Sequence, residues 1–200
     1  TNTQLLLSYI NGAIYDNAEM NDLETVGSAQ ISTSVVKYGT GSMYFNGSGS
    51  YLLAPTSSNN NLGTNNFTIE AWVNPSTLAT IQPVIADNVP GSATAYWATE
   101  ITTGGFLKFW WYSGSQIACT STTTAMVVNT WYHVVWTLNG ANEVAYINGS
   151  QIGTSTKSNS GTCSSGTNPV RVGVRSGGGD LQFKGNIPIV QIYNRTLNLT

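Results

Sequence analysis

Charged residues are scarce in this chain. Asp, Glu, Lys and Arg make up 8% of its 200 residues, and the formal net charge is −2. The seven basic residues are scattered singly, so the sequence offers no positive surface for nucleic acid. No apolar run approaches the ~20 residues that a membrane helix needs, and we expect no membrane insertion. The hydrophobic fraction of 40% still indicates a folded protein, because disordered chains combine low hydrophobicity with high net charge.

Cysteine and histidine are almost as scarce, with two Cys and one His in the whole chain. A zinc site takes about four ligands, mostly of these two types, so such a site is not expected. Cys119 and Cys163 both lie in polar, turn-rich stretches. They either form a disulfide in an oxidising compartment or stay unpaired, because their separation cannot be read from the sequence.

Short alternating runs, separated by Gly, Asn, Ser and Pro, dominate the chain, and helical periodicity is nearly absent. This pattern is typical of an all-β sandwich or barrel. Strands are predicted at residues 4–10, 42–45, 51–54, 67–73, 83–87, 95–101, 106–112, 115–120, 131–138, 143–149, 170–174 and 187–193. The stretch NGAN at 139–142 signals a tight turn between two of these strands.

Five motif blocks follow one another in the order of a known family. They are KYGTGSMYFNGSGSYL (37–52), FTIEAWVNP (67–75), TWYHVVWTLNG (130–140), EVAYINGSQIG (143–153) and FKGNIPIVQIYNRTLN (183–198). Together they resemble the laminin-G-like, concanavalin A-like jelly roll. The resemblance implies an antiparallel two-sheet β-sandwich that binds carbohydrate or protein, often within a larger extracellular, cell-surface or phage-encoded protein. We therefore expect a single domain over residues 1–200, as part of a larger protein.

Two departures from the family pattern remove carboxylates. Asn46-Gly47 stands where relatives often have Asp-Gly, and Pro188-Ile189-Val190 stands where many have an Asp-Glu pair. Both reduce the case for a family-type calcium site.

Acidic residues cluster once, in YDNAEMNDLE at 15–24. Its candidate ligands are Asp16, Asn17, Glu19 and Asp22. They carry the oxygens that Ca²⁺ prefers, but no spaced loop motif frames them. The stretch is therefore either a calcium site or a solvated acidic loop. Ca²⁺ is the one cofactor that the sequence suggests.

The stretch GGFLKFWWYSGS at 104–115 is the most aromatic part of the chain. Successive side chains of a strand point to opposite faces, and Lys108 is expected to face outward. The outward set is then Phe106, Lys108, Trp110 and Tyr112, and the inward set is Leu107, Phe109 and Trp111. A slip by one residue would bury Lys108 and expose Leu107.

The preceding run AYWATEI adds Tyr96 to this surface. Glu100 predicts that Tyr96 and Ala98 face outward, and a hairpin about the TTGG turn would bring Tyr96 beside the second strand. Tyr and Trp offer a flat apolar face with a polar group, which suits sugar rings. The predicted ligand-binding residues are Tyr96, Phe106, Lys108, Trp110 and Tyr112. Alternatively, the rest of the chain or a partner covers these rings, or they are simply exposed.

Catalysis is not expected. Glycoside hydrolases need two carboxyl groups flanking the bond, and no strand here carries closely spaced acids. His133, the sole histidine, can pair with Glu70 if their strands are neighbours, but no matched nucleophile accompanies it.

These observations favour a non-catalytic module that recognises a glycan or polysaccharide on a cell or virion surface. The alternative is a structural sandwich of a capsid, fibre or surface layer, whose aromatic face packs against neighbouring subunits.

Overall fold

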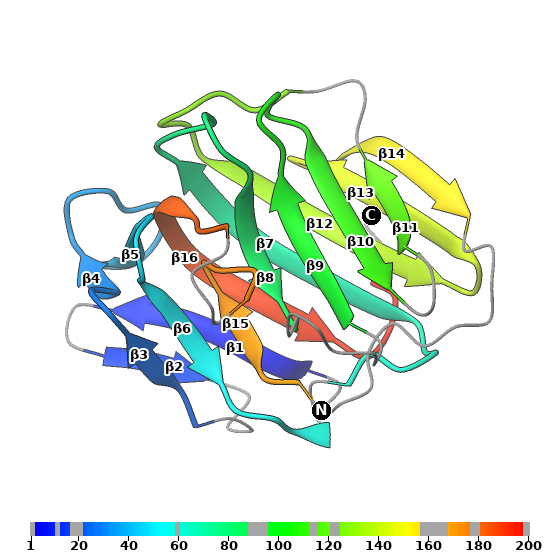
Figure 1. Ribbon diagram of the computed structural model, residues 1–200, viewed down its shortest axis with the longest axis horizontal. Coiled ribbons are helices and arrows are strands. Elements are labelled where there is room, and N and C mark those ends of the chain that lie inside the picture. Colours follow the sequence, from blue (N-terminus) through cyan, green and yellow to red (C-terminus); the bar gives the residue numbers. More distant parts are fainter. Residues whose placement is uncertain are drawn as a thin grey trace.

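The computed structural model describes residues 3–10, 13–16, 22–58, 61–87, 96–112, 116–120, 125–156, 168–176 and 181–197. In this part of the chain sixteen strands form two antiparallel sheets, which pack face to face (Figure 1). The all-β, two-sheet sandwich that the sequence predicts is therefore confirmed. The same ranges contain no helix of the length and apolar character needed to cross a membrane.

The larger sheet has nine strands in the described ranges. Its order is β14-β13-β12-β7-β16-β1-β2, with β5 paired to β16 and β4 paired to β5. The strands are β1 (Thr3–Ile10), β2 (Ala13–Asp16), β4 (Gln30–Ser32), β5 (Ser42–Asn46), β7 (Phe67–Pro75), β12 (Tyr132–Asn139), β13 (Asn142–Ile147), β14 (Ser150–Thr156) and β16 (Lys184–Tyr193). Strands far apart in the sequence, such as β7 and β16, thus become neighbours.

The smaller sheet has seven described strands in the order β11-β10-β9-β8-β15-β6-β3. They are β3 (Glu24–Val26), β6 (Tyr51–Ala54), β8 (Gln82–Ala86), β9 (Tyr96–Ile101), β10 (Leu107–Tyr112), β11 (Gln116–Thr120) and β15 (Val170–Val172). The aromatic strand β10 lies between β9 and β11, near one edge of this sheet (Figure 1).

All twelve predicted strands are present, with ends displaced by at most three residues. The structure adds β2, β3, β4 and β14, which the sequence analysis missed. Each of these pairs on one side only, at the margin of its sheet. Marginal strands bury little side-chain surface, so short polar segments such as ETV and QIS read as loops in the sequence.

The core lies between the two sheets and is built by alternation along the strands. Trp97, Trp111 and Trp136 are among its largest fully buried side chains. Phe67 of β7 meets Phe109 of β10 across the interface, with ring centroids 5.4 Å apart. Burial of aromatic side chains of this kind stabilises a fold by roughly 1.5–3 kcal/mol each. The inward faces of the strands therefore fix which residues are left for the two outer faces.

Candidate functional site

The predicted contact residues lie on one hairpin, formed by β9 and β10 about the Thr102–Gly105 turn. The Thr102 N–H donates to the Phe106 carbonyl, and the Gly105 N–H donates to the Thr102 carbonyl, each over 2.9 Å. Gly105 has a φ of +78°, and a Cβ there would collide with the carbonyl oxygen of Met126. Glycine is therefore required where this hairpin turns.

The orientation of β10 is the predicted one. Leu107, Phe109 and Trp111 are all buried in the core between the sheets. Lys108 and Tyr112 are half-buried on the opposite face of the strand. The prediction that Lys108 faces away from the inter-sheet core is therefore confirmed.

Four of the five predicted residues come together on this outer face. Tyr96 lies opposite Tyr112 in the β9–β10 register. The two rings stack with centroids 5.2 Å apart and planes inclined by 15°. Trp110 meets Tyr96 edge to face at 5.7 Å. The Lys108 ammonium lies 5.9 Å from the centroid of the Trp110 ring, within reach of a cation–π interaction.

Trp110 lies on the outer face but is covered, because only 6% of it is exposed to solvent. It packs on Ala86 of β8 and Ala98 of β9, with Tyr96 against the same cluster. Small side chains at these two positions leave room for the indole to lie on the sheet. The prediction that the Trp110 ring is exposed is therefore wrong, because the chain itself buries it. The half-buried rings beside it are Tyr96 and Tyr112, which we call the tyrosine pair.

Phe106 stands apart from the tyrosine pair, because it precedes β10 and belongs to the turn. A Cβ placed on Gly104 would lie 2.9 Å from Cδ2 of Phe106, so this ring packs against its own turn. No aromatic contact joins Phe106 to the tyrosine pair among the described residues.

Charges on the same sheet are engaged with one another. Glu100 is buried, although the sequence predicts that it faces outward: only 1% of it is exposed. Its Oε1 lies 3.5 Å from Nη1 of Arg175. Arg171 of β15 is half-buried, and burial lowers the pKa of its guanidinium, while Tyr51 and Asp87 act in the opposite direction. Asp87 Oδ1 itself accepts the backbone N–H of Trp97 over 2.6 Å. These acids therefore have structural partners.

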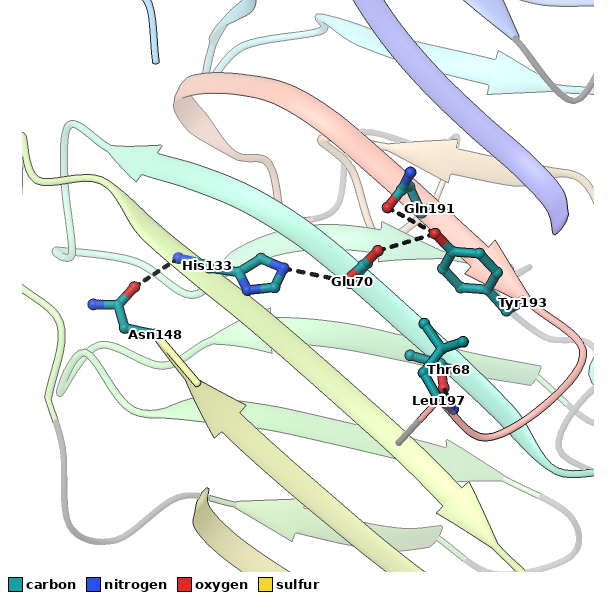
Figure 2. A network of polar contacts seen from close by, with 7 residues as sticks. All are labelled: Thr68, Glu70, His133, Asn148, Gln191, Tyr193 and Leu197. Carbon is teal, nitrogen blue, oxygen red and sulfur yellow. Dashed lines mark hydrogen bonds and ion pairs between the residues drawn. The ribbon is translucent and has the colours of Figure 1, made fainter. Parts of the chain in front are cut away.

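The outer face of the larger sheet carries a polar network centred on Glu70 of β7. Figure 2 shows Glu70 between His133 of β12 and Tyr193 of β16. Glu70 Oε2 lies 3.2 Å from His133 Nε2, and Oε1 accepts the Tyr193 hydroxyl over 3.1 Å. The predicted pairing of His133 with Glu70 is confirmed. Since both carboxylate oxygens are engaged, the network ties three adjacent strands together.

Tyr193 is strongly affected by this network. Burial, followed by the charge of Glu70 and the hydrogen bond to it, raises the pKa of Tyr193 to about 12, with Arg195 opposing. The Tyr193 hydroxyl also lies 2.9 Å from the Gln191 carboxamide (Figure 2). A hydroxyl held in this way is a poor proton donor in chemistry at neutral pH.

A cavity beside this network was not predicted. Lys37, Trp72, Trp131, His133 and Asn148 line it, and its volume is about 350 Å³. We call it the Trp72 cavity. The sequence carried a signal, because Trp131 and His133 are two residues apart and Trp72 alternates with core residues of β7. Trp72, Trp131 and His133 lie within the family motif blocks, and no pattern within one strand reveals that distant segments meet at this cavity.

The calcium and disulfide predictions stay predictions. Asn17, Glu19, Cys163 and the side chains of Asp16 and Cys119 lie outside the described residues, and Asp22 is exposed. Among the residues that the structure describes, no three His, Cys, Asp or Glu side chains are grouped to hold a metal ion. Asn46, which replaces a family aspartate, accepts from the Ser48 N–H and the Ser50 hydroxyl, each over 2.7 Å, and so organises its own turn.

Comparison with known proteins identifies the family. Residues 46–200 match a laminin G family described as the concanavalin A-like lectin/glucanases superfamily. The chain belongs to this superfamily. Among curated proteins, none matches this concanavalin A-like chain in sequence.

Three solved structures illustrate the fold of this concanavalin A-like chain. The binding domain of Paraclostridial Mosquitocidal Protein 1 is 18% identical with a TM-score of 0.77, and the match covers 99% of this chain and 50% of that one. Domain 4 of AbnA, a GH43 extracellular arabinanase from Geobacillus stearothermophilus solved with arabinotriose, is 18% identical with a TM-score of 0.75, at 99% and 95% coverage. The botulinum neurotoxin serotype D ligand binding domain, solved with N-acetylneuraminic acid, is 14% identical with a TM-score of 0.75, at 99% and 48% coverage.

At these identities the likeness establishes the concanavalin A-like fold. The chain spans about half the length of the two toxin domains, so what those domains bind is a property of proteins longer than this chain. These toxin and enzyme domains give no support to the virion alternative, which stays a prediction.

Proposed function

We propose that the chain is a non-catalytic recognition module that binds carbohydrate outside the cell, with the tyrosine pair as its contact surface. The observation that carries this proposal is the stacked, half-buried arrangement of Tyr96 and Tyr112 on the outer face of the smaller sheet. Lys108 lies on the same face of β10 and supplies a donor next to the rings.

The chemistry of this surface suits a sugar. Tyrosine combines a flat apolar ring with a hydroxyl, which complements the C–H faces and the hydroxyl groups of a pyranose or furanose ring. Trp110 supports the pair from the side, because its buried indole contacts Tyr96 edge to face and limits the positions that this ring can take. A contact surface held in place before binding loses less conformational entropy on binding.

The solved relatives support the same class of ligand. The arabinanase domain was solved with arabinotriose and the serotype D toxin domain with N-acetylneuraminic acid, so this fold carries saccharides in at least two settings. The arabinanase is extracellular, which agrees with a module that acts outside the cell. Because one fold hosts many functions, the proposal rests on the surface of this chain and uses the relatives as support.

The proposed absence of catalysis follows from how the acids are used. Hydrolysis of a glycosidic bond needs two carboxyl groups on either side of the bond. On the smaller sheet Glu100 is buried beside Arg175, and Asp87 accepts the backbone N–H of Trp97. On the larger sheet Glu70 is held by His133 and Tyr193. Each of these carboxylates therefore has a structural partner within the chain.

The test is a polysaccharide pull-down and glycan array that includes arabinan oligosaccharides and sialylated glycans. We expect binding by the native chain and a loss of about tenfold or more, ~1.4 kcal/mol, in the Tyr96→Ala, Tyr112→Ala double variant. Tyr146→Ala is the matched control, because it removes a half-buried tyrosine from β13 in the other sheet. Equal loss in both variants, or binding of neutral glycans unchanged in the double variant, would refute the proposed surface.

A further inference from the structure

The Trp72 cavity lies on the sheet opposite to the tyrosine pair and is built from separate segments. Lys37 comes from the connection between β4 and β5, and Asn148 from the turn between β13 and β14. Trp72 of β7 and His133 of β12 are paired across their strands, with Trp131 just before β12. A volume of about 350 Å³ is within the range of roughly 300–1,000 Å³ that small-molecule sites occupy.

Aromatic rings form the apolar part of this cavity, and they are held by their neighbours. Trp72 and His133 stack with centroids 5.2 Å apart and planes inclined by 22°. Tyr38 meets Trp72 edge to face at 5.3 Å. Trp131 is half-buried and lines the same space. The cavity thus has aromatic walls of the kind on which a sugar ring packs.

Lys37 supplies the charge of the cavity. Lys37 is half-buried, and its ammonium lies 4.6 Å from the centroid of the Trp72 ring. Among the described residues Lys37 has no carboxylate partner, and no acidic residue lines the cavity. A cation that is partly removed from water and lacks a counter-ion favours an anionic ligand.

Asn148 adds a hydrogen-bond donor. Its Oδ1 accepts the backbone N–H of His133 over 2.9 Å (Figure 2). In the described part of the chain its amide nitrogen has no acceptor, so this group is left to donate to a ligand. The neighbouring Glu70 does not line the cavity, and both of its oxygens are bound by His133 and Tyr193.

We propose that the Trp72 cavity is a second saccharide site, selective for a sugar ring that bears an anionic group. The sugar ring packs on Trp131, and Lys37 and Asn148 bind its anionic group beside Trp72. Because the whole chain carries a net charge of −2, general electrostatic attraction does not account for such binding. The site is separate from the tyrosine pair, so either proposal can fail without the other.

The test is calorimetric titration of the native chain with oligogalacturonate, its methyl ester and a sulfated galactan oligosaccharide. We expect binding of the carboxylated ligand, the sulfated ligand or both. The uncharged methyl ester is expected to bind at least about tenfold more weakly than the acid, because a charge-assisted hydrogen bond is lost. The carboxylated and sulfated ligands show which anionic group is preferred. Failure to bind either acidic ligand, or equal affinity for acid and ester, would overturn the proposal.

Variants locate the binding. Lys37→Gln and Trp131→Ala are expected to weaken acidic-ligand binding about tenfold or more, and Lys37→Arg is expected to restore it. Lys184→Gln removes the same charge from an exposed position of β16 and is expected to have no effect. If Trp131→Ala does not fold, Trp131→Phe with an unchanged thermal midpoint replaces it in the binding measurement. Binding that survives in Lys37→Gln, or that falls equally in Lys184→Gln, would contradict this site.

Discussion

The indole nitrogen of Trp111 donates to Oε1 of Glu143 over 2.7 Å, joining β10 of one sheet to β13 of the other. Trp111 is fully buried and Glu143 is 2% exposed, so this hydrogen bond lies inside the sandwich. A buried carboxylate is costly without a donor, and the Trp111 ring that fills the core also supplies one. The aromatic strand is therefore anchored from within while its other face is left for contacts.

Removal of this donor is expected to destabilise the fold. Trp111→Phe keeps a ring in the core but takes the indole N–H from Glu143, and we expect the free energy of unfolding to fall by about 1–3 kcal/mol. Glu143→Gln keeps an accepting oxygen and is expected to cost less. Urea denaturation of both variants and of the double variant measures the coupling between the two residues. Strictly additive effects would show that the hydrogen bond contributes nothing.

Trp110 and Tyr112 are expected to respond differently to truncation, because one is buried and the other half-buried. Trp110→Ala removes the indole from its cluster with Ala86 and Ala98, so we expect a loss of about 3 kcal/mol in unfolding free energy together with weaker glycan binding. Tyr112→Ala is expected to cost within about 1 kcal/mol of stability and to weaken binding mainly by loss of contact. Chemical denaturation paired with glycan titration separates the two; a stable Trp110→Ala chain would contradict the supporting role of the indole.

Gly105 is expected to tolerate no side chain. Its φ of +78° and the closeness of the Met126 carbonyl mean that Gly105→Ala strains the β9–β10 turn. We expect a loss of about 1–3 kcal/mol in thermal or urea unfolding. Gly140→Ala is the control, because Gly140 has a φ of +62° but its added Cβ would meet no atom within 4 Å. An equal loss at the two glycines would show that backbone strain alone, and not the contact with Met126, is responsible.

Tyr193 is expected to ionise well above the ordinary tyrosine value. Its pKa is raised from 10.0 to about 12 by burial and by Glu70. The stability that this shift contributes is complete below pH 10 and is lost as the pH rises through about 12. The difference in absorbance at ~295 nm between the native chain and Tyr193→Phe isolates this one titration. A midpoint near pH 10 in that difference would contradict the network around Glu70.

Much of the fold could be predicted because a strand has a period of two. Lys108 fixed the orientation of β10, and the turn signals at NGAN and TTGG placed two hairpins. The burial of Trp110 could not be predicted, since it depends on the small side chains of Ala86 and Ala98 on two other strands. The inward position of Glu143 depends likewise on a donor from the opposite sheet. The Trp72 cavity escaped prediction because its lining comes from separate segments that only the folded chain brings together.

The most direct test of glycan recognition by the tyrosine pair uses the indole N–H resonances of the six tryptophans. Trp110 contacts Tyr96 edge to face. Trp72 and Trp131 line the cavity on the other sheet, and the remaining three are buried in the core. On titration with a neutral glycan that the chain binds, we expect the Trp110 resonance to shift while those of Trp72 and Trp131 stay in place. A shift confined to Trp72 and Trp131, with Trp110 unmoved, would contradict the account.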